Sequence, residues 1–147
     1  MKYVENISAQ AASQIETLPN DSAWICIHDE YSPPHQLSIE PSANILQLTF
    51  SDVRAVTQHK GQFYHPMSLD DANKILEFIE ENKESKFIIN CNAGISRSGA
   101  IALFVHKTYG HELKPNFWKT SDPNPFVLGM LISEYERNHR SIKQKNT

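Results

Sequence analysis

The feature that most constrains this chain is residues 87–100, Phe-Ile-Ile-Asn-Cys-Asn-Ala-Gly-Ile-Ser-Arg-Ser-Gly-Ala. An apolar run precedes a loop of small and polar residues, and a second apolar run follows it, which predicts a strand, a loop and a helix. The amides of a tight loop can converge on an anion, and the positive end of the following helix adds to the attraction. The segment therefore predicts a phosphate-sized anion site between a strand and a helix.

Within this loop, Cys91 and Arg97 are separated by five residues. The inward dipoles of such a loop favour the thiolate of Cys91, and the planar guanidinium of Arg97 can bind two phosphate oxygens at once. Gly94 stands where the chain folds back, a place that favours a positive φ. Ser98 is placed either to reach back toward the sulfur or to cap the helix.

Cysteine, five residues, arginine and serine, with glycine third after the cysteine, resemble the signature loop of the cysteine-dependent protein tyrosine phosphatase superfamily. The wider sequence, from 22–29 through 48–53 to 123–125, resembles the small single-domain, dual-specificity-like phosphatases of bacteria and phages. The fold expected is α/β, with a central, mostly parallel sheet of about four strands flanked by helices and the site at the carboxyl end of a strand. One position departs from the family: it usually has histidine directly before the cysteine, and this chain has Asn90.

The resemblance implies hydrolysis of protein phosphomonoesters through a phosphocysteine on Cys91, with no cofactor. Phosphotyrosine is the leading substrate, with phosphoserine and phosphothreonine as further ones, so the expected partner is a phosphorylated protein or peptide. Arg97 and the loop amides would bind the phosphoryl oxygens. The residues expected to bind phosphate are Asn92, Ala93, Gly94, Ile95, Ser96 and Arg97.

The leaving oxygen also needs an acid from outside the loop. Asp52 ends a predicted strand, and the similar bacterial and phage proteins place their acid aspartate in the same Phe-x-Asp context. We therefore assign Asp52 as the general acid, against the alternative of an aspartate that only begins a turn. Asp70 and Asp71 compete, but both fall in the first turn of a predicted helix, where the helix dipole accounts for acidic residues.

Asn90 is the position where this chain is most unusual. The histidine found there in the family is thought to orient the loop and tune the thiolate, and asparagine can donate similar hydrogen bonds but carries no titratable charge. We therefore expect a slower enzyme or a shifted pH optimum, not a loss of activity.

The spacing of four histidines and of the other cysteine, Cys26, does not match that of metal ligands. His28, His35, His59 and His65 lack the spacing of metal ligands, and Cys26 has no nearby partner of the zinc type. We expect solvated loop histidines and no metal.

Length and composition narrow the class of protein. The chain of 147 residues with a net charge of -3 fits one domain over 1–140 with a frayed tail at 141–147, and it argues against a nucleic-acid partner bound through bulk charge. Two cysteines indicate a reducing compartment, and neither a signal peptide nor a membrane-spanning run is present in the sequence. We expect a cytoplasmic protein, and the sequence carries no signal for an oligomeric state.

Hydrophobic patterning and capping residues predict the other elements. The segments 53–66 and 111–122 are predicted to be irregular. The expected strands are 24–28, 45–50 and 86–90, and the expected helices are 9–17 after Ser8, 69–81 after Ser68, one from Ser98 to near Gly110, and one from Pro125 after Asn124.

Two other functions fit the same loop. One is a phosphate-recognition module with weakened catalysis, although such proteins commonly lose the cysteine. The other is an RNA 5′-phosphatase, although this acidic chain has no obvious basic groove. Arsenate reductases and low-molecular-weight phosphatases carry the loop near the amino terminus, and rhodanese-type sulfurtransferases usually differ in spacing.

Overall fold

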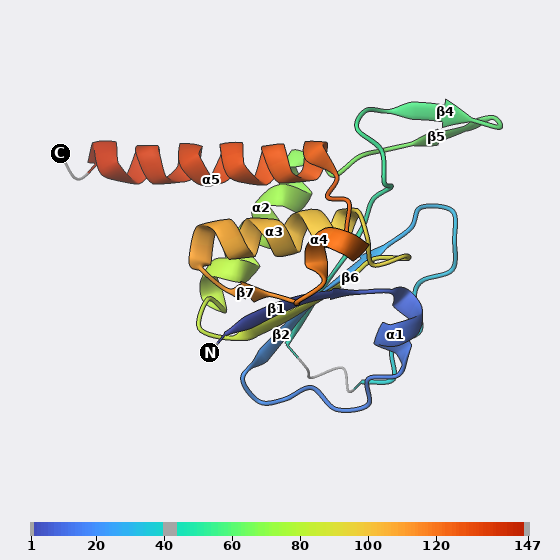
Figure 1. Ribbon diagram of the computed structural model, residues 1–147. Helices are drawn as coiled ribbons and strands as arrows, with labels where there is room; N and C mark the ends of the chain where they lie inside the picture. Colours follow the sequence, from blue (N-terminus) through green and yellow to red (C-terminus); the bar gives the residue numbers. More distant parts are fainter. Residues whose placement is uncertain (1, 40–43, 146–147) are drawn as a thin grey trace.

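A parallel five-stranded sheet forms the centre of the protein (Figure 1), whose computed structural model describes residues 2–39 and 44–145. The strand order is β3-β2-β6-β1-β7, and each pairing in this sheet is parallel. The strands are β1 (Tyr3–Ile7), β2 (Ser22–His28), β3 (Ile45–Thr49), β6 (Lys86–Asn90) and β7 (Glu112–Leu113). The predicted α/β architecture is confirmed, and the sheet is entirely parallel.

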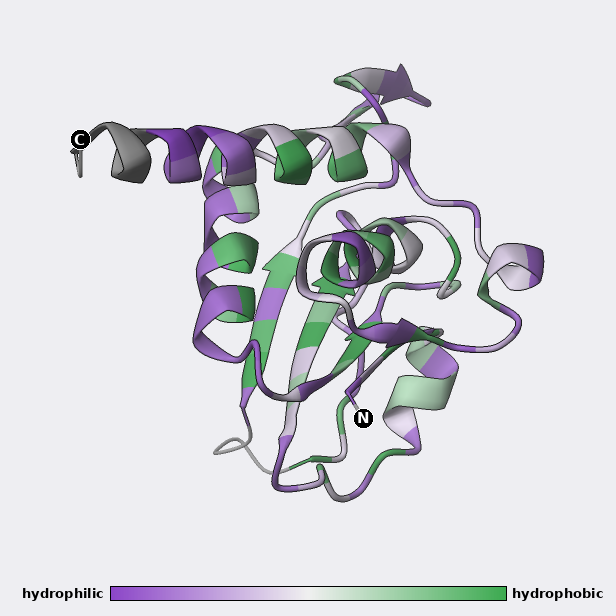
Figure 2. Cartoon of the chain, turned by 60° about the vertical axis from the view of Figure 1, so that its left-hand side comes forward, coloured by the Kyte–Doolittle hydropathy of each residue, from purple (hydrophilic) through white to green (hydrophobic). Residues whose placement is uncertain are grey.

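Helices cover both faces of this sheet (Figure 1). One face carries α2 (Leu69–Glu81), α3 (Arg97–Tyr109), α4 (Phe117–Thr120) and α5 (Pro125–Lys145). The other carries α1 (Ala9–Ser13) and the segment after β2. Because side chains alternate along a strand, Ile25 and Ile27 of β2 pack on the first face, and Trp24 and Cys26 on the second. Figure 2 shows hydrophobic residues concentrated on the sheet and on the helices that pack on it.

Most predicted helix ends are confirmed. Ser68 and Asp71 form a capping box at the start of α2, and Gly110 ends α3 in the left-handed conformation. The Asn124 side chain accepts hydrogen bonds from the amides of Phe126 and Val127 in the first turn of α5. Helix α5 continues through Lys145, so the expected tail at 141–147 overlaps it, and residues 146–147 lie outside the described part of the chain.

Helix α1 is shorter than predicted, ending at Ser13 instead of near Thr17. Ser8 caps it as expected, through a hydrogen bond from the amide of Ala11. Ile15 and Leu18 still pack against the second hydrophobic cluster, but from a non-helical segment. Burial of these side chains therefore did not require the helix to continue.

Three pieces of sheet were not predicted from the sequence. Strand β1 escaped notice because one of its two buried positions holds a polar residue, Asn6. Strand β7 has only two residues. The segment 53–66 contains a hairpin, β4 (Thr57–His59) and β5 (Gln62–Tyr64), which projects away from the central sheet (Figure 1). Its turn, Lys60-Gly61, has positive φ at both residues, as a two-residue type I′ turn requires.

Within the residues that the structure describes, we find no helix that is both long enough and apolar enough to span a membrane.

Gly94 is fixed by its contact with the end of β1. Its φ is +75°, and a Cβ there would lie 2.4 Å from the carbonyl carbon of Ile7 and 2.5 Å from the nitrogen of Ser8. We expect Gly94→Ala to lower the free energy of unfolding, measured in urea, by about 3 kcal/mol or more. The alanine would be strained at this positive φ, and the backbone of Ile7 and Ser8 would also have to move to make room for its Cβ. Gly110→Ala is the matched control, since Gly110 has φ +77° with nothing within 4 Å of the added carbon, and it should cost only about 1–2 kcal/mol. Equal losses would contradict this account.

Candidate active site

The loop between β6 and α3 is held by hydrogen bonds to its outward carbonyl groups. The donors come from β1, from the start of α1 and from the segment before α5. These bonds run from Asn6 Nδ2 to Gly94 O (2.9 Å), from Ala9 N to Asn92 O (3.0 Å), from Asp122 N to Ile95 O (3.1 Å) and from Asn124 N to Ser96 O (3.0 Å).

These bonds set the direction of the loop amides. Because a peptide group is planar, turning a carbonyl outward turns the N–H of the next residue inward. Each hydrogen-bonded carbonyl is followed by one inward amide, and these amides belong to Ala93, Ile95, Ser96 and Arg97. Together with the amino-terminal end of α3, they form a cup suited to an anion.

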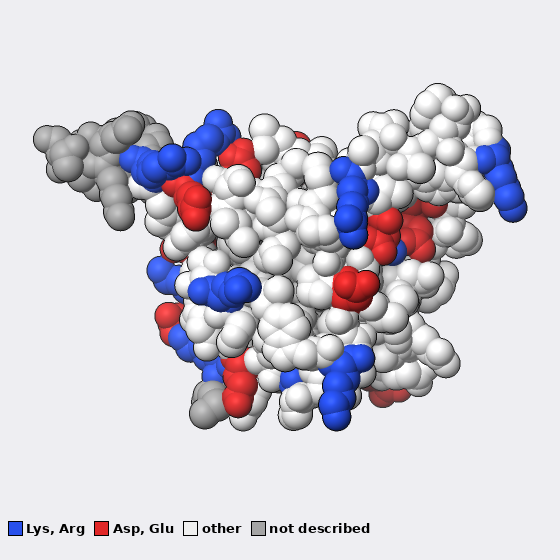
Figure 3. Space-filling view, turned by 45° about the horizontal axis from the view of Figure 1, so that its top comes forward, with Lys and Arg blue, Asp and Glu red and all other residues white. Residues whose placement is uncertain are grey.

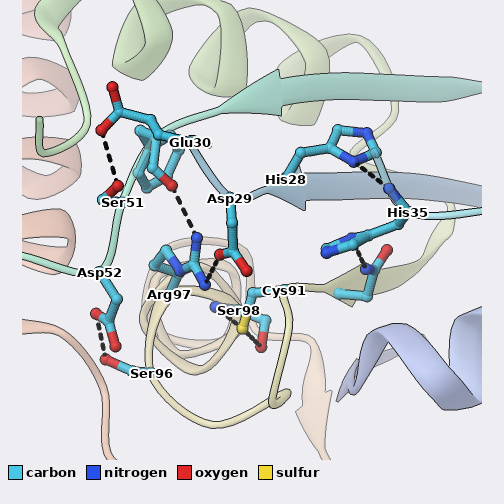
Figure 4. Close-up of polar contacts among 12 residues, drawn as sticks. His28, Asp29, Glu30, His35, Ser51, Asp52, Cys91, Ser96, Arg97 and Ser98 are labelled. Atoms are coloured by element: carbon cyan, nitrogen blue, oxygen red, sulfur yellow. Dashed lines mark hydrogen bonds and ion pairs between the residues drawn. The ribbon is translucent and has the colours of Figure 1, made fainter. Parts of the chain in front are cut away.

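Cys91 lies at the start of this loop, directly after β6, and is only 2% exposed. Ser98, in the first turn of α3, approaches the sulfur twice: Oγ lies 3.1 Å and the backbone nitrogen 3.5 Å from Sγ (Figure 4). Of the two roles expected for Ser98, the structure shows contact with the sulfur. Both groups can donate to a thiolate.

Arg97 is oriented by the ends of two other strands. Its Nη2 lies 2.6 Å from Asp29 Oδ1, just after β2, and its Nη1 donates to Phe50 O at 2.8 Å, just after β3 (Figure 4). The residue is 5% exposed, and among the described residues its buried Nε has no hydrogen-bond partner. A buried unpaired donor costs about 1–3 kcal/mol, so Nε would gain from any acceptor brought within its reach.

A cleft of about 400 Å³ opens in front of the loop. It is lined by Asn92 and Arg97 from the loop and by Asp52. Asp52 Oδ1 accepts hydrogen bonds from Ser96 Oγ and from Asn124 Nδ2, both at 2.8 Å. The structure thus brings the predicted acid to the rim of the predicted phosphate loop.

The competing aspartates have local roles in α2, as predicted. Asp71 belongs to the capping box, and Asp70 pairs with Lys74 one turn along the helix.

Among the cleft residues that were not predicted from the sequence are Asp29, Glu30 and Tyr31. They directly follow β2, and ligands of parallel sheets bind where strands end, so their position was a usable signal. Tyr31 has a positive φ of 61°, donates from its hydroxyl to Phe63 O at 2.6 Å, and packs edge-on against Tyr64. This fixes Tyr31 between the central sheet and the hairpin.

Glu30 fastens the hairpin to the site. Its Oε1 accepts hydrogen bonds from Ser51 Oγ (2.7 Å) and from the amide of His65 (2.6 Å), and its Oε2 lies 2.9 Å from His65 Nδ1. Partial burial acts to raise the pKa of Glu30, but the bonds from His65 and Ser51 outweigh it, so the pKa is lowered. Glu30 therefore stays ionised and holds the end of the hairpin segment.

The interpretation of the histidines was partly wrong. His59 and His65 are exposed, as expected, but His28 is buried in β2 and His35 is half-buried beside it. Nitrogen atoms of these two rings and the sulfur of Cys26 lie within 4.8 Å of one another. Sequence spacing does not reveal this cluster, because His35 reaches it from an irregular segment.

No family model matches the chain, and no curated protein matches it. Solved structures do match. Human DUSP28 is 19% identical, with 94% of each chain covered and a TM-score of 0.55. Tk-PTP in its active form is 17% identical, over 93% of this chain and 94% of that one, with a TM-score of 0.50. Human tyrosine phosphatase-like serine/threonine/tyrosine-interacting protein is 20% identical. The match covers 80% of this chain and 78% of that one, with a TM-score of 0.50.

The chain has the fold of the cysteine-dependent phosphatases. The resemblance read from the signature loop is confirmed at this level. Similarity to the small bacterial and phage members stays a prediction.

The Asp29–Arg97 pair should stabilise the folded protein. Asp29→Asn leaves the buried guanidinium without its counter-charge, and we expect the free energy of unfolding in urea to fall by about 1–3 kcal/mol. Asp21→Asn is the control, because Asp21 pairs with Lys86 at 3.8 Å on the surface and should change stability by less than about 0.5 kcal/mol. A loss no larger than that of the control would show that Asp29 does not anchor Arg97.

Proposed function

We propose that this protein is a cysteine-dependent phosphatase that hydrolyses phosphotyrosine, and phosphoserine or phosphothreonine as well, in a phosphorylated protein or peptide. The observation that carries the proposal is the buried Arg97, anchored at both terminal nitrogens and, within the described part of the chain, unpaired at Nε, in the same loop as Cys91, whose carbonyls point outward. That arrangement suits three equatorial oxygens of a phosphoryl group in line with a nucleophile.

The reaction that we propose assigns one role to each of these groups. The Cys91 thiolate attacks phosphorus, a sulfur–phosphorus bond forms, and the ester oxygen leaves as Asp52 gives it a proton. Asp52 then takes a proton from water, which displaces the sulfur and releases inorganic phosphate. Ser98 can donate to the thiolate as it departs, and Arg97 with the loop amides stabilises the phosphoryl charge in both steps.

The cleft favours an aryl ester as substrate. Tyr31 and Tyr64, packed edge to face with centroids 5.3 Å apart, line it together with the carboxylates of Asp29 and Glu30. An aromatic ring on the substrate can pack against such walls, which supports phosphotyrosine as the leading substrate. The two free cysteines are both buried, which fits a reducing, cytoplasmic compartment.

A binding module that has lost catalysis is the main alternative, since one structural neighbour is a phosphatase-like interacting protein. An RNA 5′-phosphatase is less well supported. Asp29, Glu30 and Asp52 line the cleft, and on the face shown in Figure 3 basic side chains are scattered among acidic ones. A phosphate-rich polymer would be repelled by such a rim.

Replacing the nucleophile tests the proposal. Cys91→Ser should lower hydrolysis of p-nitrophenyl phosphate and of a phosphotyrosyl peptide by about 10³-fold or more, while the peptide still binds in calorimetry. Rapid-mixing experiments on the unmodified enzyme should trap phosphate on Cys91. Tight peptide binding without turnover in the unmodified protein would favour the binding module, and full activity in Cys91→Ser would remove the mechanism.

The role of Asp52 is tested by changing the leaving group. Asp52→Asn should lower kcat on a phosphotyrosyl peptide by about 10²-fold with little change in KM. The loss should be smaller on p-nitrophenyl phosphate, because nitrophenolate leaves more readily without a proton. Asp70→Asn, which alters a carboxylate at the start of α2, is the control and should change neither. Equal losses on both substrates would place the acid elsewhere.

A further inference from the structure

Behind the phosphate loop, on the face of the sheet that carries α1, Asn90 lies in a buried polar network. Asn90 Oδ1 accepts a hydrogen bond from Trp24 Nε1 at 2.8 Å, and Asn90 Nδ2 lies 3.2 Å from His35 Nδ1. An indole nitrogen can only donate, so the contact with Trp24 fixes which way the amide faces. The Asn90 NH₂ group therefore donates to His35, whose Nδ1 must be an unprotonated acceptor.

His28 continues the same network. The backbone N–H of His35 donates to His28 Nδ1 at 2.9 Å, so the proton of His28 is on Nε2, where Gln47 Oε1 accepts it at 2.8 Å. Both rings are thus neutral, each with a defined tautomer. The hydrogen bonds therefore form a series that begins at the Trp24 indole and ends at the Gln47 side chain, and each bond in it pairs one donor with one acceptor.

The same tautomers argue against a metal ion at Cys26, His28 and His35. The sulfur of Cys26 lies 3.6 Å from His28 Nε2 and 3.8 Å from His35 Nδ1, spacings that would suit zinc. Zinc would need the lone pair of His28 Nε2, moving that proton to Nδ1, where it would face the N–H of His35. Ligating histidines normally donate their other N–H to an acceptor, and here the partner is a donor.

We propose that His35 is a positioning residue for the nucleophile: as a neutral acceptor it holds the side chain of Asn90, and through it the start of Cys91. Asn90 is paired in the sheet with Ile7 on one side and Cys26 on the other. The contacts with Trp24 and His35 fix its side chain as well. The backbone that leaves Asn90 for Cys91 therefore starts from a residue with little freedom.

This role makes the site sensitive to acid. Protonation of His35 puts a hydrogen on Nδ1 that faces the NH₂ group of Asn90, so the contact is lost. Burial lowers the pKa of His35 below its ordinary 6.5; repulsion from His28, once that ring is protonated, and from Arg97 lowers it further, and Asp29 opposes them. Cys26, the other titratable neighbour, is kept as a thiol because burial raises its pKa to about 11. The contact therefore holds at neutral pH and is lost only as pH falls through the lowered pKa.

The test rests on the proposed function only in taking Cys91 as the nucleophile, and its main readout is the rate of Cys91 alkylation by iodoacetamide, which needs no phosphatase activity. His35→Leu should slow alkylation at pH 7 about fivefold, the equivalent of one hydrogen bond, and lower kcat more than it raises KM. His35→Asn keeps an acceptor near the position of Nδ1 and should stay within about twofold of the unmodified protein. In His35→Asn, the alkylation rate should also no longer show the change below about pH 6.5 that protonation of His35 causes in the unmodified protein. His139→Asn, on the exposed side of α5, is the control.

Other outcomes overturn the proposal. Unchanged alkylation in His35→Leu would do so, as would equal damage in His35→Asn and His35→Leu, which would indicate packing alone. In an Asn90→Leu background, His35→Leu should add little; full additivity would show that His35 does not act through Asn90. Stoichiometric zinc that is lost in Cys26→Ser would establish the metal site instead. If the alkylation results hold but no phosphate ester is hydrolysed, the proposed function fails and the positioning role stands.

Discussion

The contact between the end of β1 and the phosphate loop is the interaction on which the site depends. Asn6 donates to Gly94 O and to Ser121 Oγ, and so joins the loop to the segment before α5. Gly94 packs so closely on Ile7 that no larger residue fits without backbone movement. Because these contacts hold the loop carbonyls outward, they also hold the following amides inward. A central strand with a buried polar residue thus preorganises the anion cup, which is where most of the benefit of such a site lies.

Arg97 is preorganised by a different part of the sheet. Parallel strands end at one edge, so the residues after β2 and β3 lie close to the residue that opens α3. Asp29 and the carbonyl of Phe50 hold the two terminal nitrogens of the guanidinium. The carboxylate also offsets the charge of a buried cation, which would otherwise be costly. The second acidic residue, Glu30, acts on the hairpin instead, so adjacent carboxylates position Arg97 and the wall of the cleft.

What the sequence could predict was local. The strand, loop and helix around Cys91, the positive φ of Gly94, the approach of Ser98 to the sulfur and the capping box of α2 each follow from residues a few positions apart. Placement of Asp52 at the loop came from the family resemblance, which encodes a long-range contact. Strand β1 and the Asp29–Arg97 pair depend on partners far along the chain, and one polar residue was enough to hide the pattern of β1. The hairpin differs, because its turn at Lys60-Gly61 is local in sequence and could have been predicted, although it was not.

Asn90 shows how a local departure can be compensated at long range. In the sequence it stands directly before Cys91, where the resembling family usually has histidine. In the folded chain a ring from residue 35 meets its side chain, and Trp24 satisfies the other end of the amide. A buried polar network is favourable only when its members are satisfied, and both ends of the Asn90 amide have a partner here. The change from histidine to asparagine at this position is therefore matched by partners far along the chain, which a motif read residue by residue does not reveal.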